Sequence, residues 1–149
     1  MHDPGEQKSP YFRWIGGRTL GTLWWSSMDA TKIVLDFCEA VAGNDVKSVL
    51  SFFAEDAVYH NIPMEAVRGR QQIEETLGRF LTPGGETEFR VLAIAASGNT
   101  VLTERIDVLT MGGKRIELPV MGTFEIDDQG KIQAWRDYFD MQQVVSQMS

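Results

Sequence analysis

The spacing of apolar residues changes once along this chain, near Glu86, from a helical repeat to a strand-like one. Before that point, apolar side chains recur every three or four residues in segments that end at glycine or proline. After it, alternating runs are separated by stretches rich in Gly, Asn and Asp, which are typical of hairpins. Helices followed by a hairpin-linked sheet predict the α+β class. The alternating runs span 87–96, 100–110, 115–126 and 131–139.

Capping and breaking residues set the bounds of the elements outside these runs. The first helix begins at Ser27 or Asp29, either of which can cap it, and it ends at Gly43. Pro83 and the two glycines that follow stop a later helix. The other predicted elements are a helix capped by Asn44, a strand over 57–62, a helix over 70–81 and a final helix over 141–148.

Length and charge restrict the class of protein. The 149 residues fit one domain with one hydrophobic core, which we expect over 28–149 after a flexible N-terminal extension over 1–27. Because that extension lacks the apolar core of a signal peptide, we expect a cytoplasmic protein. The net charge of −7 disfavours nucleic acid and anionic membranes as partners. The single cysteine, Cys38, excludes an internal disulfide and a cysteine-based zinc site, so we expect it to fill core space.

One predicted strand carries two opposite charges among apolar residues. Since residues two apart share a face of a strand, Arg105 and Asp107 are neighbours on one side of the run over 100–110. The same face carries Val101, Thr103 and Leu109. Taken alone, such a pair is more often a structural ion pair than a functional site.

Two further runs place polar groups beside aromatic ones. Asp137 shares its face with Trp135 and Phe139, and Tyr59 shares its face with Asn61. If these faces line the concave side of one bent sheet, they enclose an apolar pocket with a few convergent polar groups. That arrangement is the usual form of a small-molecule site, although the periodicity by itself names no reaction.

Three segments make the pattern more specific: Val-Tyr-His-Asn-Ile-Pro over 58–63, Thr-Glu-Arg-Ile-Asp-Val-Leu over 103–109 and Trp-Arg-Asp-Tyr-Phe-Asp over 135–140. Together they resemble the limonene-1,2-epoxide hydrolase family. The likeness extends from about residue 30 to residue 144 and includes Phe-Phe-Ala-Glu-Asp over 52–56. It implies a cone-shaped α+β fold, in which N-terminal helices pack on a strongly curved, mixed, mostly antiparallel sheet around a deep apolar pocket. This fold is shared with ketosteroid isomerase and the nuclear transport factor two-like group, and the resemblance also implies a homodimer.

The resemblance also implies a role for each matching residue. Asp137 corresponds to the base that activates water, and Asp107 to the acid that protonates the oxygen of a small apolar epoxide. Arg105 bridges the two, while Tyr59 and Asn61 help to hold the water. The activity implied is hydrolysis of the epoxide to a vicinal diol without a cofactor. The residues at substrate-lining positions are Leu109, Leu118, Val120 and Phe139.

The chemistry is consistent with these residue types. Water opens an epoxide in one step when an acid at the ring oxygen acts together with a base behind the water. Burial and the proximity of two carboxylates favour one protonated and one ionised aspartate, whereas Arg105 opposes both effects. We therefore expect Asp107 and Asp137 to share a proton. A guanidinium beside them repels a cation, and His60 faces away, so the sequence predicts no metal site.

Two other functions are compatible with the same fold. A ketosteroid-isomerase-like isomerase or dehydratase needs a base and an oxyanion hole of neutral donors, and Arg105 between two aspartates suits that chemistry poorly. A non-catalytic ligand-binding module would not need to bury two carboxylates and an arginine, which is costly. Both alternatives stay open from the sequence.

Overall fold

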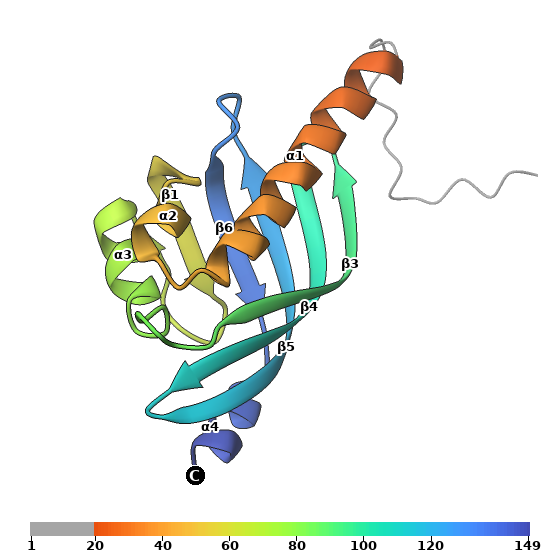
Figure 1. Cartoon of the computed structure of the whole chain (residues 1–149). Coiled ribbons are helices and arrows are strands. Elements are labelled where there is room, and N and C mark those ends of the chain that lie inside the picture. The colour runs from red at the N-terminus through yellow and green to blue at the C-terminus, as the bar shows by residue number, and fades with distance from the viewer. Residues whose placement is uncertain (1–19) are drawn as a thin grey trace, which may run out of the picture.

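The computed structural model describes residues 20–149, with side chains from Ala30 onward, and shows helices packed on one curved six-stranded sheet (Figure 1). The predicted extension over 1–27 falls largely outside this range, so its flexibility stays a prediction. The helices are α1 (Leu20–Val41), α2 (Val46–Leu50), α3 (Arg70–Leu77) and α4 (Met141–Met148). The strands are β1 (Phe53–Asn61), β2 (Val67–Arg68), β3 (Glu88–Ser97), β4 (Thr100–Met111), β5 (Lys114–Ile126) and β6 (Ile132–Tyr138).

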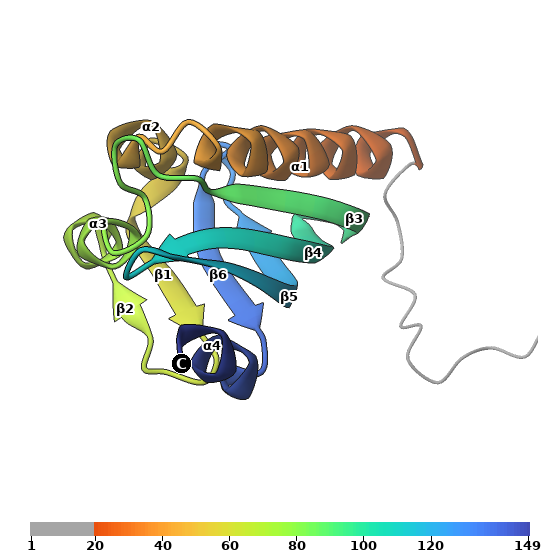
Figure 2. The ribbon, with the colours of Figure 1, turned by 60° about the horizontal axis from the view of Figure 1, so that its bottom comes forward.

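The sheet has the order β2-β1-β6-β5-β4-β3, and only the β1–β6 pair is parallel. The prediction of a mixed, mostly antiparallel sheet in the α+β class is therefore confirmed. Strands β3, β4 and β5 bend strongly, and α1 lies along one side of the sheet while α4 lies at the opposite end (Figure 2). A register irregularity between Val91 and Ala93 accompanies the bend of β3, as expected of a β-bulge.

The core between α1 and the sheet is aromatic and is centred on Trp135 of β6. This indole is stacked between Tyr59, at 4.0 Å between ring centroids, and Phe124, at 5.7 Å. Phe37 of α1 meets Trp135 edge-on at 5.0 Å, and both side chains are fully buried. Aromatic pairs in such geometries contribute about 0.5–1.5 kcal/mol beyond the area they bury. The packing therefore fixes the inner face of β6 against α1.

Several element bounds differ from the sequence predictions. Helix α1 begins at Leu20, before the predicted caps Ser27 and Asp29, because serine and aspartate are also tolerated in a helix interior. Helix α3 ends at Leu77 rather than at residue 81, because Gly78 follows and the chain continues in turns. Strand β1 begins at Phe53, four residues early, and β2 was not predicted because two residues are too few to show a period.

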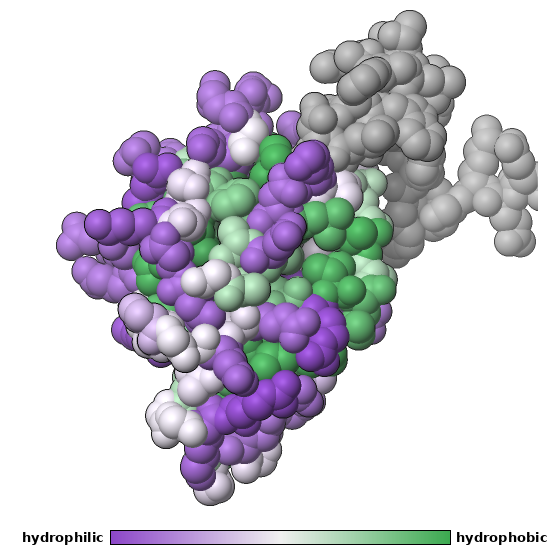
Figure 3. Space-filling model, viewed as in Figure 1, coloured by the Kyte–Doolittle hydropathy of each residue, from purple (hydrophilic) through white to green (hydrophobic). Residues whose placement is uncertain are grey.

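The face of the sheet that turns away from α1 carries exposed apolar side chains. Leu102, Met121 and Tyr138 lie on three adjacent strands there and are 45–51% exposed. We call these three residues the outer apolar row. In the view of Figure 3, apolar surface also gathers over β3 beside α1. In the part of the chain that the structure describes, no helix is both long and apolar enough to cross a membrane.

Candidate active site

Three ionisable side chains meet on the inner face of the sheet, from two strands separated by β5. Arg105 donates from Nε to Asp107 Oδ1 at 2.9 Å and from Nη2 to Asp107 Oδ2 at 2.8 Å. The same Nη2 donates to Asp137 Oδ2 at 2.9 Å, across the strand between them. The three side chains are 0%, 5% and 4% exposed, respectively. One guanidinium nitrogen thus joins two carboxylates that lie 30 residues apart in the sequence.

The carboxylate of Asp137 is also held from the other side. Trp135, two residues earlier on β6, donates its indole N–H to Asp137 Oδ1 at 2.7 Å. Because Trp135 is stacked between two rings, this donor has a fixed direction. The alternation of the sequence placed Trp135 on this face only as an apolar neighbour, so its role as a donor was missed. A tryptophan two residues from an aspartate on one strand face is a signal that could have indicated it.

Tyr59 and Asn61 lie beside this carboxylate because β1 runs parallel to β6. The strand register pairs Tyr59 with Trp135 and Asn61 with Asp137. The Tyr59 hydroxyl donates to Asn61 Oδ1 at 3.0 Å. Burial raises the pKa of Tyr59 well above its ordinary value, so the phenol stays neutral. The two residues that the sequence placed on one face therefore form one polar pair next to Asp137.

A cavity of about 180 Å³ opens onto these groups, and its wall is mostly apolar. Tyr59, Asn61, Asp107 and Asp137 all border it. The four residues predicted at lining positions, Leu109, Leu118, Val120 and Phe139, also line it. Sequence reasoning missed the lining residues from the loop after β1, from α3 and the turn after it, from β3, from the end of β4 and from α4. The period of one segment does not show which residues of different elements border the same cavity. Those additional lining residues are Met64, Thr76, Arg79, Phe80, Phe89, Met111, Met141 and Val144.

Burial dominates the electrostatics of the two carboxyls. It raises the pKa of Asp137 to about 6, helped by the nearby charge of Asp107 and opposed by Arg105. It also raises the pKa of Asp107, against the hydrogen bonds and charge of Arg105. Burial alone would lower the pKa of Arg105, but the two carboxylates outweigh it and raise that pKa. Burial and the mutual repulsion of the two carboxylates therefore favour protonation of the pair, and the permanently charged guanidinium opposes it.

Aromatic rings support the guanidinium of Arg105. Its Cζ lies 4.7 Å from the ring centroid of Phe89 and 5.8 Å from that of Phe124. Such contacts favour a cation over the face of a ring. Among the described residues, every buried side-chain nitrogen and oxygen has a hydrogen-bond partner. Each nitrogen and oxygen of the buried charged groups therefore has at least one hydrogen-bond partner.

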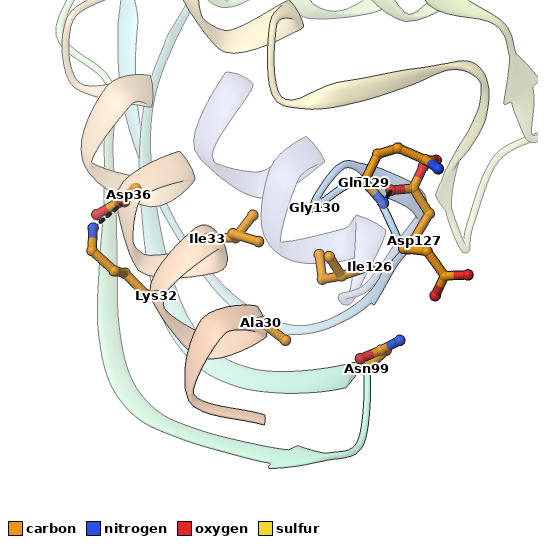
Figure 4. Close-up of a pocket in the computed structure, with 10 residues that line it drawn as sticks. Ala30, Lys32, Ile33, Asp36, Asn99, Ile126, Asp127, Gln129 and Gly130 are labelled. Atoms are coloured by element: carbon orange, nitrogen blue, oxygen red, sulfur yellow. Dashed lines mark hydrogen bonds and ion pairs between the residues drawn. The ribbon is translucent and has the colours of Figure 1, made fainter. Parts of the chain in front are cut away.

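A second, larger hollow of about 530 Å³ lies between α1 and the turn that joins β5 to β6 (Figure 4). Its polar groups are exposed or bound to their own loop. Lys32 pairs with Asp36 on the surface of α1, and Asp127 accepts from the backbone N–H groups of Gln129 and Lys131. None of the residues predicted for the site lies here.

Comparison with known proteins identifies the family. Residues 28–149 match the family model of the limonene-1,2-epoxide hydrolase catalytic domain. The chain belongs to the limonene-1,2-epoxide hydrolase family. It is 38% identical over 105 residues to epoxide hydrolase EphG of Mycobacterium tuberculosis, an alignment that covers 70% of this chain and 69% of that protein. The resemblance stated from three short segments is thereby confirmed.

Solved structures agree on the fold. The structure of an M. tuberculosis LEH-like epoxide hydrolase superposes with a TM-score of 0.70 at 32% identity, covering 82% of this chain and 93% of the other. A putative polyketide cyclase from Xanthomonas campestris pv. campestris superposes with a TM-score of 0.73 at 22% identity, covering 83% of this chain and 99% of the other. At that identity the second match shows the fold alone, which confirms the predicted cone.

Proposed function

We propose that this chain, an epoxide hydrolase of the limonene-1,2-epoxide hydrolase family, opens a small apolar epoxide in one step by direct attack of water and releases a vicinal diol. The observation that carries the proposal is the pair of buried carboxyls joined by Arg105 at an apolar cavity. An acid and a base that act together are what one-step opening of an epoxide needs. The cavity volume of about 180 Å³ suits a small substrate.

In this proposal, Asp137 is the base. Each carboxylate oxygen has two lone-pair sites, so Asp137 can accept a hydrogen bond from water although Trp135 and Arg105 already donate to it. Tyr59 and Asn61, bonded to each other, border the cavity beside it. They supply further hydrogen-bonding groups that direct the lone pair of the water toward the ring carbon.

Asp107 is the proposed acid. As the water oxygen bonds to the ring carbon, the C–O bond on that carbon breaks and its electron pair goes to the ring oxygen. Asp107 gives that oxygen a proton while Asp137 takes one from the water, so the pair holds the same number of protons before and after the reaction. Arg105 contacts both carboxyls through Nη2 and stabilises the charge wherever it lies. No step in this sequence calls for a cofactor or a metal.

A single-turnover reaction in heavy-oxygen water tests the one-step route, with enzyme in excess over a cyclic epoxide. Direct attack places the label in the diol on the first turnover and gives the trans product by inversion. Attack by an aspartate through an ester would instead place an unlabelled protein oxygen in the first diol. Unlabelled diol, or an alkylated Asp137 found by mass spectrometry, would refute the proposal. Asp137→Asn, run in parallel, controls for labelling by uncatalysed hydrolysis.

We also propose that the chain forms a homodimer through the outer apolar row. Leu102, Met121 and Tyr138 present one exposed apolar strip, and a strip of this kind can pair with its own copy about a two-fold axis. Analytical ultracentrifugation should give twice the mass of one chain. Met121→Lys should shift the protein toward the monomer, whereas Glu117→Lys, on the same strand, should leave the mass unchanged. A monomeric wild-type protein would refute this part of the proposal.

A further inference from the structure

The guanidinium of Arg105 lies against a strand position that has no side chain. The register aligns Thr103 of β4, Gly122 of β5 and Asp137 of β6 in one row across the sheet. A Cβ atom placed on Gly122 would overlap Nη1 of Arg105. It would also lie 2.8 Å from Thr103 Oγ1 and 2.9 Å from Asp137 Oδ1. The absence of a side chain at residue 122 is therefore what lets the guanidinium lie between β4 and β6.

Thr103 closes the remaining side of the same guanidinium. Its hydroxyl oxygen accepts from Arg105 Nη1 at 3.0 Å, and the side chain is buried. The other two nitrogens of the guanidinium, Nε and Nη2, donate to the carboxyls. All three nitrogens therefore donate hydrogen bonds: Nε and Nη2 to the carboxyls, and Nη1 to the Thr103 hydroxyl. Rotation of the planar group would break at least one of these bonds.

We infer that Thr103 and Gly122 are positioning residues, which hold the plane of Arg105 so that Nη2 reaches Asp107 and Asp137 together. A guanidinium bonded bidentately to Asp107 alone could swing away from Asp137, since a single bond joins it to that carboxyl. The Thr103 hydroxyl opposes this swing from the far end of the group. The inference rests on the proposed roles of the two carboxyls, and it assigns Thr103 and Gly122 no contact with substrate.

Thr103→Val tests the hydroxyl, because valine keeps the shape of threonine and removes the acceptor. We expect kcat to fall about tenfold with KM within about twofold of wild type, since misplacement of a reacting group affects the chemical step. Thr103→Ser restores an acceptor and should keep kcat within about threefold of wild type. Arg105 lowers the pKa of Asp137. If Arg105 is held less firmly in Thr103→Val, the acid limb of the kcat/KM profile should therefore move to higher pH. Gly122→Ala should show the same pattern.

The outcomes are decisive in either direction. Wild-type kcat and an unchanged pH profile in Thr103→Val would overturn the inference, as would equal losses in Thr103→Val and Thr103→Ser. Should Thr103→Val not fold, as judged by its melting curve, Thr103→Ala against Thr103→Ser makes the same comparison. A ¹³C titration of the Asp137 carboxyl requires no turnover, so it tests the inference even where the one-step mechanism fails. An unchanged titration in Thr103→Val would overturn the inference, and a raised pKa would support it.

Discussion

Of two hollows that the described residues form, the larger is bordered by exposed charges and the smaller by buried ones. The larger one, of about 530 Å³, is bordered by Lys32, Asp36 and Asp127, whose charges face solvent or their own turn. The smaller one, of about 180 Å³, reaches Asp107 and Asp137, which are almost wholly removed from water. An exposed charge keeps its hydration and its ordinary chemistry, whereas a buried one must be held by partners that also change its pKa.

The larger of these hollows is therefore not the one that reaches desolvated charge. Among the residues whose side chains the structure describes, the cost of burying two carboxyls and a guanidinium is borne at the smaller cavity alone, where Arg105 bonds both acids. Variants in each region test whether the smaller cavity alone takes part in the reaction.

The largest effect should come from neutralising either acid. Asp137→Asn removes the proposed base and Asp107→Asn the proposed acid, so each should lower kcat/KM by roughly 10²–10⁴-fold, the usual size of general acid–base catalysis. Diol formation measured by chromatography checks this, with near-ultraviolet circular dichroism as the control for folding. Retention of more than about a tenth of the wild-type rate would contradict the assignment.

Arg105→Lys should have the second largest effect on the rate. A lysine ammonium is a point charge and cannot bridge two carboxyls as the planar guanidinium does. We expect roughly a 10²-fold loss in kcat, the size of effect that misplaced catalytic groups produce. Steady-state kinetics with the same epoxide measures it. Normal turnover would remove Arg105 from the mechanism.

The pH dependence should follow the proposed base. Because burial raises the pKa of Asp137 to about 6, its ionised form is lost as the pH falls through that value. Below it, kcat/KM should drop about tenfold per pH unit, so that at pH 4 it is about a hundredfold lower. A rate profile measured between pH 4 and 9 checks this, with circular dichroism to show that the fold persists. A flat profile across pH 6 would exclude Asp137 as the base.

Changes to the apolar wall should be smaller. Leu109→Ala and Phe139→Ala enlarge the cavity without touching the charged groups, so they should alter which epoxide carbon or enantiomer reacts. Shape in an apolar pocket discriminates by about 1–3 kcal/mol, so product ratios should shift rather than disappear. Chiral chromatography of the diols measures the ratio. Unchanged ratios in both variants would place the substrate against other residues.

The larger hollow should give the smallest effect. Asp36→Asn and Asp128→Asn remove charges from its border, and surface changes of this kind rarely matter. Activity and product ratios should stay within about twofold of wild type. A loss comparable to that of Arg105→Lys would mean that the hollow takes part in catalysis and that the contrast between the two regions is wrong.

Much of the fold followed from local pattern. The hairpin signals placed the four long strands to within one residue at each end, and α4 has the predicted bounds. Errors fell at the start of α1, the end of α3, the start of β1 and the cap of α2, which is Asp45 rather than the predicted Asn44. At such ends several residue types can either continue an element or end it. The short β2 depends on pairing with β1 and carries no period of its own.

At the site, alternation along each strand settles which side chains share a face, whereas the assembled sheet settles which faces meet. Alternation along β4 makes Arg105 and Asp107 neighbours whatever the rest of the chain does, because strand stereochemistry is local. The bond from Arg105 to Asp137 depends on the registers of β4, β5 and β6, which turns, bulges and aromatic packing set together. The space that Gly122 leaves for the Arg105 guanidinium depends on the same alignment. In the sequence, this glycine indicates only a weak strand position. Contacts across strands arise from the whole fold, and so they could not be derived from the period of any one segment.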